Sequence, residues 1–234
     1  MLKFTVILLI IITSFENLEA INYATVYPKA YTEATLFLNR QSWMKDSLIK
    51  RAVDPDIALA IVFPELIRFH ELQNKMEVTA LKTLYIQYGK QYADFSIGRF
   101  QMKPSFAEEI EKSWNNLQSK PTALSQITFP ILDTKENRIQ RLIRLDHIQG
   151  QLLYLSIFYL VVEQRFKGVT KSKQEKVLLY ATAYNSGYNR PISKLAESIF
   201  AKTFYTELIR TPLTICYSYA DIALFFYYQT ASKF

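Results

Sequence analysis

An unbroken apolar run, residues 57–64, is followed directly by Glu65, and three of the next four residues are apolar again. A helix that is hydrophobic on every face packs inside a protein core. A carboxylate in such a helix must be paired, protonated or used chemically. Burial also raises the pKa of a carboxyl group, as a general acid working near neutral pH requires. Residues 56–69 therefore predict a core helix that carries a candidate catalytic acid. Two simpler alternatives are a Glu65 that turns outward and one that forms an ion pair with Arg68.

Prolines mark the beginning and the middle of this expected helix. Asp54 or Asp56 can cap its N-terminus, with Pro55 in the first turn. Pro64 removes one backbone hydrogen bond and disfavours helical angles at the residue before it. We expect the helix to kink or restart at Pro64, beside the acid.

The composition favours an all-α or predominantly α fold. Half of the 234 residues are hydrophobic and only five are glycine, which suits helices and a large core better than a loop-rich or all-β chain. The formal net charge is +7, but no basic cluster interleaved with aromatic residues indicates nucleic-acid binding. A polyanionic wall or a membrane surface would suit the charge equally well.

The chain offers little for metal or disulfide chemistry. It has two histidines, and His147 lacks a second histidine at metal-binding spacing. The single cysteine, Cys216, lies in an apolar aromatic segment and is expected to be a buried small hydrophobe. We therefore expect no metal and no cofactor.

Residues 1–20 have the pattern of a secretory signal peptide, with Lys3 before a nine-residue apolar stretch and Ala20 at a cleavage point. The protein is thus expected to be exported to the periplasm or cell envelope. The eleven apolar residues 152–162 are too few to span a bilayer, so no stable membrane anchor is expected. Residues 21–53 form an N-terminal helical extension in this scheme, 54–194 the main domain, and 195–234 C-terminal helices packed on the same domain.

Apolar periodicity and capping patterns predict the remaining helices. Asp133 and Glu136 have the spacing of a capping box. Three glutamates, at 108, 109 and 111, are expected to be helix-end and surface charges. The expected helices cover residues 31–53, 74–88, a segment from 104, 133 to about 165, 173–187, and 216–229 after one or more further turns beyond Pro191.

Two further stretches suggest a binding site. Residues 91–103 lack periodicity, and Gly98 there permits a tight turn or the close approach of a ligand. Gln101 has both a donor and an acceptor for a sugar amide or hydroxyl. Residues 173–187 end in a helix C-terminus at Gly187, which places Tyr184 and Asn185 in the last turn. A core tyrosine and a capping asparagine are the alternative interpretations.

Together these stretches resemble the soluble lytic transglycosylase domain of the lysozyme-like superfamily. That family has a helix with one catalytic Glu, a Gly-Leu-Met-Gln-x-x-Pro segment and an Ala-Tyr-Asn-Ala-Gly segment. The counterparts here are Glu65, the run Gly98–Pro104 and the run Ala183–Gly187, and the resemblance covers residues 54–191. Leu66 replaces the usual Ser after the acid, and Arg99 with Phe100 replaces the Leu-Met pair.

The resemblance implies cleavage of the β-1,4 bond between N-acetylmuramic acid and N-acetylglucosamine in peptidoglycan, leaving a 1,6-anhydro end. Glu65 would protonate the glycosidic oxygen and then take a proton from the substrate's C6 hydroxyl. Tyr184 would orient Glu65, and substrate-binding residues would be Gly98, Gln101, Met102, Tyr184 and Asn185. A hydrolytic lysozyme of the same fold is the first alternative, with Asp94 as the second carboxylate. A catalytically degenerate, exported wall-binding protein is the second.

Overall fold

The computed structural model describes residues 21–71, 75–207 and 210–231, with the backbone alone for 70, 71 and 75–78. The predicted signal peptide lies outside these residues. The described chain is predominantly α-helical, as predicted, with one two-stranded antiparallel sheet. The elements are α2 (Tyr23–Val26), α3 (Pro28–Arg40), α4 (Trp43–Lys50), α5 (Pro55–Glu71), α6 (Lys75–Tyr88), α7 (Pro104–Asn115), the 3₁₀ turn η2 (Thr122–Leu124), α8 (Lys135–Asp146), α9 (Ile148–Arg165), α10 (Lys173–Ser186), α11 (Ile192–Ser198), β1 (Lys202–Phe204), β2 (Tyr217–Ser218) and α12 (Tyr219–Ala231).

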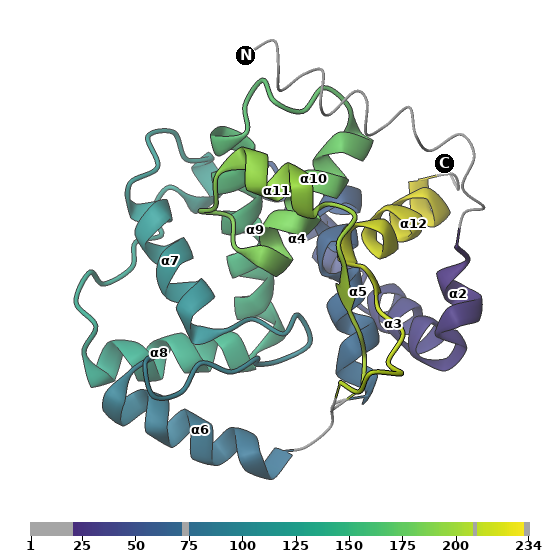
Figure 1. Ribbon diagram of the computed structural model, residues 1–234. Helices are drawn as coiled ribbons and strands as arrows, with labels where there is room; N and C mark the ends of the chain where they lie inside the picture. The colour runs from purple at the N-terminus through teal and green to yellow at the C-terminus, as the bar shows by residue number, and fades with distance from the viewer. Residues whose placement is uncertain (1–20, 72–74, 208–209, 232–234) are drawn as a thin grey trace.

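Helix α5 is the centre of one side of the molecule. It packs against α3, α10 and α12, while α6, α7, α8 and α9 pack on one another on the other side (Figure 1). Residues 57–63 are all buried, five of them completely, as the apolar run predicts. The core helix and its candidate acid therefore lie where N-terminal, central and C-terminal parts of the chain meet.

The N-terminus of α5 agrees with the sequence, but the helix does not restart in its middle. Asp54 caps the helix, because its Oδ1 accepts from the N–H groups of Asp56 and Ile57 at 3.1 and 3.3 Å. The expected restart at Pro64 is wrong, since the helix continues through it from Pro55 to Glu71. An interior proline costs about 3 kcal/mol. Burial of the apolar run against three neighbouring helices offsets that cost.

The long helix expected from 133 to about 165 is also wrong, because α8 and α9 meet at an angle of 98°. His147 between them has extended backbone angles, φ −101° and ψ 135°. The two helices come close together at Gly150, where a Cβ would lie 2.1 Å from the Arg144 carbonyl oxygen. The N-cap of α8 is Thr134, whose hydroxyl accepts from the Asn137 N–H at 3.3 Å. Asp133 was the predicted cap.

The N-terminal and C-terminal parts of the chain also differ from the sequence prediction. Residues 31–53 are divided between α3 and α4, which separate at Gln41 and Ser42 so that α4 can contact both α5 and α9. The β1–β2 sheet was not predicted, and the last helix begins at Tyr219 because residues 217–218 belong to β2. Cys216 is only partly buried, contrary to expectation.

Three helices agree closely with the sequence: α6, α7 with its proline start, and α10. Gly187 ends α10 with a positive φ of 96°, as a residue after a helix C-terminus often does. In the part of the chain that the structure describes, no single helix is long and apolar enough to cross a membrane. The bent pair of α8 and α9 passes that test only when the two are taken together.

Candidate functional site

Glu65 lies on the inner side of α5 and is almost completely buried, with 4% of its surface exposed. Its two carboxylate oxygens accept from Nη1 of Arg68 at 3.2 and 3.1 Å. The Arg68 guanidinium is itself fixed, because its Nε donates to the Tyr205 carbonyl at 3.3 Å and it lies 4.5 Å from the centre of the Phe204 ring. The ion pair that the sequence left open is therefore formed, and the outward orientation of Glu65 is wrong.

Burial and the ion pair act on the Glu65 carboxyl in opposite directions. Loss of hydration disfavours the charged form and raises the pKa, whereas Arg68, Tyr219 and Lys103 lower it. Burial is the larger effect and raises the pKa of Glu65 from 4.5 to about 7. Near neutral pH the group is thus present in both protonation states, so it can donate a proton and accept one.

Two tyrosine hydroxyls flank the carboxyl group. Tyr219, at the start of α12, donates to the Ile61 carbonyl at 3.0 Å and lies within hydrogen-bonding reach of Glu65. Tyr184, near the end of α10, donates its only proton to the Phe100 carbonyl at 2.7 Å. Burial, together with the nearby Glu65 charge, raises the pKa of both tyrosines well above its usual range. Both hydroxyls are therefore neutral at physiological pH, and their protons are held by the Phe100 and Ile61 carbonyls.

This arrangement changes the predicted role of Tyr184. The sequence resemblance assigned Tyr184 the task of orienting Glu65, but its proton is used by the backbone at Phe100. The Tyr219 hydroxyl likewise donates its proton to the backbone, at the Ile61 carbonyl, but it lies within hydrogen-bonding reach of Glu65 and lowers the pKa of that carboxyl group. Sequence reasoning missed Tyr219 because it lies in a helix of many aromatic residues, where nothing local distinguishes one tyrosine from another. Tyr184 instead joins the segment around Phe100 to the surroundings of Glu65.

The segment at residues 97–102 forms a tight turn. Ile97 and Met102 exchange both backbone hydrogen bonds, at 2.9 and 3.1 Å. Gly98 has a φ of +70°, and a Cβ there would lie 1.9 Å from Nε2 of Gln151. Of the two uses that the sequence suggested for Gly98, the tight turn is confirmed.

Gln151 on α9 holds this turn from beneath. Its side chain is buried, its Oε1 accepts from the Phe100 N–H at 2.9 Å, and its Nε2 donates to the Leu145 carbonyl at 2.8 Å. The peptide group on one side of Phe100 is thus bound by Gln151 and that on the other side by Tyr184. These contacts connect α9, the turn and α10 into one rigid support next to Glu65.

The other residues predicted to bind substrate lie in different environments. Gln101 is half-buried, and its Nε2 donates to the Gly98 carbonyl at 2.8 Å, which leaves its carbonyl oxygen for a ligand. Met102 is 1% exposed, so it packs in the core and does not present a binding surface. Its position follows from the exchange of hydrogen bonds with Ile97. Asn185 is exposed and lines the pocket described below.

Arg99, which replaces an apolar residue of the family pattern, extends from the turn toward α3 and α5. Its guanidinium lies 4.8 Å from the centre of the Phe37 ring and 4.4 Å from that of Phe69. These cation–π contacts fasten the turn to α5 one helical turn beyond Glu65. The N-terminal extension, through Phe37, therefore contributes directly to the surroundings of the site.

Glu111 was expected to be a surface charge, but it is buried, with 2% of its surface exposed. Both of its oxygens are bound: Arg141 donates to one at 2.7 and 3.0 Å, and Arg144 to the other at 2.9 Å, where the Tyr154 hydroxyl also donates. Such a satisfied network fixes how helices pack. It joins α7, α8 and α9, and thereby supports the helix that carries Gln151.

Asp94, the second carboxylate that a hydrolase would need, has a structural role. Its oxygens accept from the backbone N–H and the hydroxyl of Ser105 at 3.0 and 2.8 Å. These bonds satisfy donors in the first turn of α7. The carboxylate is therefore engaged at a helix N-terminus.

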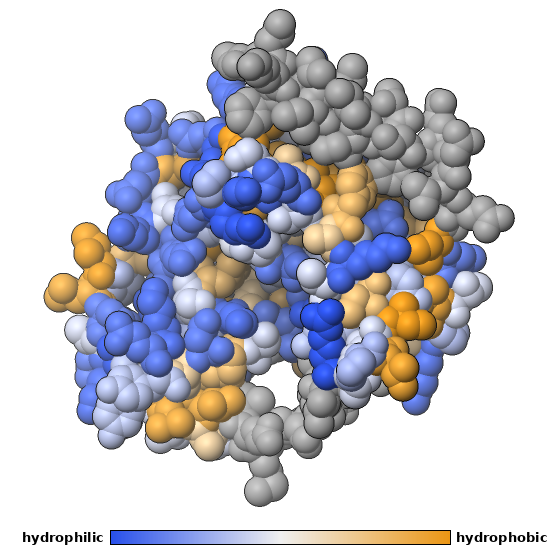
Figure 2. All heavy atoms as spheres, viewed as in Figure 1, coloured by the Kyte–Doolittle hydropathy of each residue, from blue (hydrophilic) through white to orange (hydrophobic). Residues whose placement is uncertain are grey.

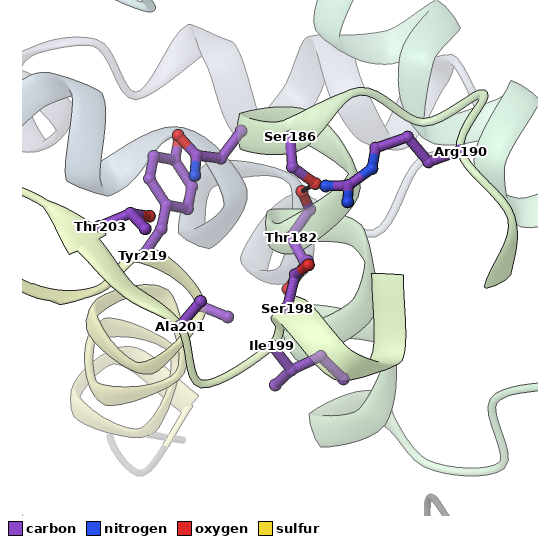
Figure 3. A pocket seen from close by; sticks show the side chains of 10 residues that line it. Thr182, Ser186, Arg190, Ser198, Ile199, Ala201, Thr203 and Tyr219 are labelled. Atoms are coloured by element: carbon purple, nitrogen blue, oxygen red, sulfur yellow. Dashed lines mark hydrogen bonds between the residues drawn. The ribbon is translucent and has the colours of Figure 1, made fainter. Parts of the chain in front are cut away.

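One face of the molecule is hollowed. Figure 2 shows the hollow between the side that carries α6 and α8 and the side that carries α5 and the β1–β2 sheet. A separate pocket of about 150 Å³ opens between α10, α11 and α12 (Figure 3). Tyr219 belongs both to the lining of that pocket and to the surroundings of Glu65.

Among the described residues, no group of three or more His, Cys, Asp and Glu side chains could hold a metal ion. The chemistry available is that of one buried carboxyl group, one arginine and two neutral tyrosines.

Comparison of the chain with models of known protein families, with curated proteins and with solved structures gives no match.

Proposed function

We propose that the protein is a lytic transglycosylase that cleaves the β-1,4 bond between N-acetylmuramic acid and N-acetylglucosamine in peptidoglycan. The resemblance of three segments to that family motivates the proposal. The observation that carries it is the environment of Glu65, a buried carboxyl group whose pKa is raised to about 7. General acid–base catalysis is most effective when the pKa of the group lies near the working pH.

A single carboxyl group is sufficient for this reaction. In the proposed first step, protonated Glu65 transfers its proton to the glycosidic oxygen and becomes a carboxylate. The substrate's own N-acetyl group then stabilises the positive charge at the sugar carbon. In the second step the carboxylate takes the proton of the C6 hydroxyl, whose oxygen bonds to that carbon and closes the 1,6-anhydro ring. The attacking group is part of the substrate, which supplies proximity without a bound water.

The neighbours of Glu65 suit both steps. Arg68, with its nitrogen 3.1 Å from the carboxylate, stabilises the charge that forms after the first proton transfer. The neighbouring Tyr219 hydroxyl also lowers the pKa of Glu65 and so favours the same charge. Burial opposes them, so that the carboxyl group regains its proton readily in the second step. We propose Glu65 as the catalytic residue and the turn at residues 97–102 with Asn185 as sugar-binding elements.

The proposal is tested by digesting purified sacculi and measuring the released sugars by mass spectrometry. The expected product is an anhydro-muropeptide, one water lighter than the reducing sugar that a hydrolase releases. Glu65→Gln is expected to abolish release, while Glu197→Gln, a change at an exposed carboxylate on α11, leaves it unaltered. Reducing ends would identify a hydrolase, and binding without cleavage would identify a wall-binding protein. Full activity of Glu65→Gln would refute the catalytic assignment.

A further inference from the structure

The pocket between α10, α11 and α12 has a mixed polar and apolar lining, and most of its lining residues lie beyond the segment that resembles the transglycosylase family. Its volume of about 150 Å³ is well above the roughly 10–15 Å³ that a single water molecule needs in a cavity. This space suits a group the size of a small amino acid. The lining residues are Thr182, Asn185, Ser186, Arg190, Ser198, Ile199, Ala201, Thr203, Tyr219 and Ala220 (Figure 3).

Three hydroxyl groups in this pocket have already used their only proton. Thr182, Ser186 and Ser198 each donate at 2.7 Å to the backbone carbonyl four residues earlier in their own helix. A hydroxyl oxygen whose proton is engaged can only accept further hydrogen bonds. The group that meets these oxygens must therefore be a donor.

Arg190, in contrast, requires an acceptor from the ligand. Its side chain points into the pocket toward Ser186 and Thr182 (Figure 3). Its backbone is fixed, because its carbonyl accepts from Arg165 at 3.2 Å. Within residues 21–71, 75–207 and 210–231, no carboxylate pairs with the Arg190 guanidinium. A guanidinium matches a carboxylate through two parallel hydrogen bonds, so the pocket also calls for an anionic acceptor.

We propose that this pocket binds an α-amino-acid head group, with the carboxylate on Arg190 and the ammonium on the hydroxyl oxygens of Thr182, Ser186 and Ser198. One small ligand then satisfies both requirements within the available volume. A neutral sugar would leave the arginine without an anion, and a simple anion would bring no donor of its own to hydroxyl oxygens that can only accept.

If the protein acts on peptidoglycan, on which this step rests, the substrate contains such a group. It is the free end of a diaminopimelate side chain in a stem peptide that has not been cross-linked. A cross-link through this side-chain amine converts the ammonium into an amide and removes its positive charge. The pocket would therefore select uncross-linked strands, and Tyr219 would place the bound peptide next to the Glu65 environment.

Isothermal titration calorimetry of the full chain with two stem tripeptides tests the proposal without any sugar. One tripeptide ends in meso-diaminopimelate and the other in lysine, so they differ by a single carboxylate. The first is expected to bind about tenfold more tightly or better, as a hydrogen-bonded charge pair implies. Acetylation of the side-chain ammonium is expected to weaken its binding by a similar factor.

Variants test the carboxylate-binding and ammonium-binding residues of the pocket separately. Arg190→Gln is expected to remove the difference between the two tripeptides, whereas Ser198→Ala is expected to weaken both equally, because both carry the ammonium. Lys202→Gln is the matched control, a change at an exposed cation on β1 beside the lining residues. It is expected to alter neither affinity, and circular dichroism checks that each variant is folded.

Equal binding of the two tripeptides by the unaltered protein, or binding of neither, overturns the proposal. So does a preference that survives in Arg190→Gln. Because these titrations involve no cleavage, they can fail while Glu65-dependent release of anhydro sugars is observed. Conversely, they can succeed while the catalytic proposal fails.

Discussion

Replacing Glu65 with glutamine is expected to change how the stability of the protein depends on pH. The folded protein holds the Glu65 proton more tightly than the unfolded chain does, because burial raises the pKa from 4.5 to about 7. Stability from this group is therefore fully present below pH 4.5 and is lost as the pH rises through about 7. Glutamine does not titrate, so the variant lacks this loss.

The size of the effect follows from the two pKa values. They differ by about 2.5 pH units, and each unit corresponds to about 1.4 kcal/mol. The unaltered protein is thus expected to lose about 3 kcal/mol of unfolding free energy between pH 4 and pH 8 that the variant does not lose. The amide also changes the interaction with Arg68, but that cost is nearly independent of pH in this range and shifts the whole curve.

Urea denaturation of both proteins at several pH values between 4 and 8.5 measures the difference directly. Glu197→Gln serves as the control, because that carboxylate is 61% exposed in its side chain and its variant should run parallel to the unaltered protein. If the Glu65→Gln curve also runs parallel to it within 1 kcal/mol or so, the reasoning that burial outweighs the Arg68 ion pair is refuted.

Three further predictions concern the supports of the site. Gly98→Ala is expected to cost at least about 2 kcal/mol of unfolding free energy, because of its positive φ and the clash of the new Cβ at 1.9 Å. Gly168→Ala, at a φ of +78° with open space around it, should cost less in the same urea titration. Tyr219→Phe removes the hydroxyl that lowers the pKa of Glu65, so the fall in stability should move to higher pH, and an unmoved curve would contradict this. Glu111→Gln removes the nearest carboxylate from the buried Arg141 and the partly buried Arg144 and is expected to cost about 3–5 kcal/mol in thermal or urea unfolding. A loss below 1 kcal/mol would show that the network is not a determinant of packing.

Much of the helical architecture could be predicted from local sequence patterns. The apolar run before Glu65 required a buried helix, and Asp54 with Pro55 marked its start. Pro104 likewise indicated where α7 begins, and Gly187 indicated where α10 ends. These features depend on residues a few positions apart, so they are encoded within each segment.

The predictions failed where packing between distant segments decides the outcome. Pro64 signals a break, but the burial of α5 on three helices keeps it continuous. The bend between α8 and α9 is made possible by Gly150, whose missing side chain lets the Arg144 carbonyl approach. Glu111 looks like a surface charge in its own helix, and only the arrival of Arg141 from α8 shows that it is a buried ion-pair partner.

The sequence by itself determined that the helix carrying Glu65 lies in the core, because its residues 57–64 are all apolar, but it left open whether Glu65 turns outward. Only the tertiary structure decided what surrounds the carboxyl group. Tyr219 comes from the last helix and Tyr184 from α10, and neither is near Glu65 in the chain. The pKa of a buried acid depends on the charges and donors within a few ångströms of it, and those are fixed by how the helices pack.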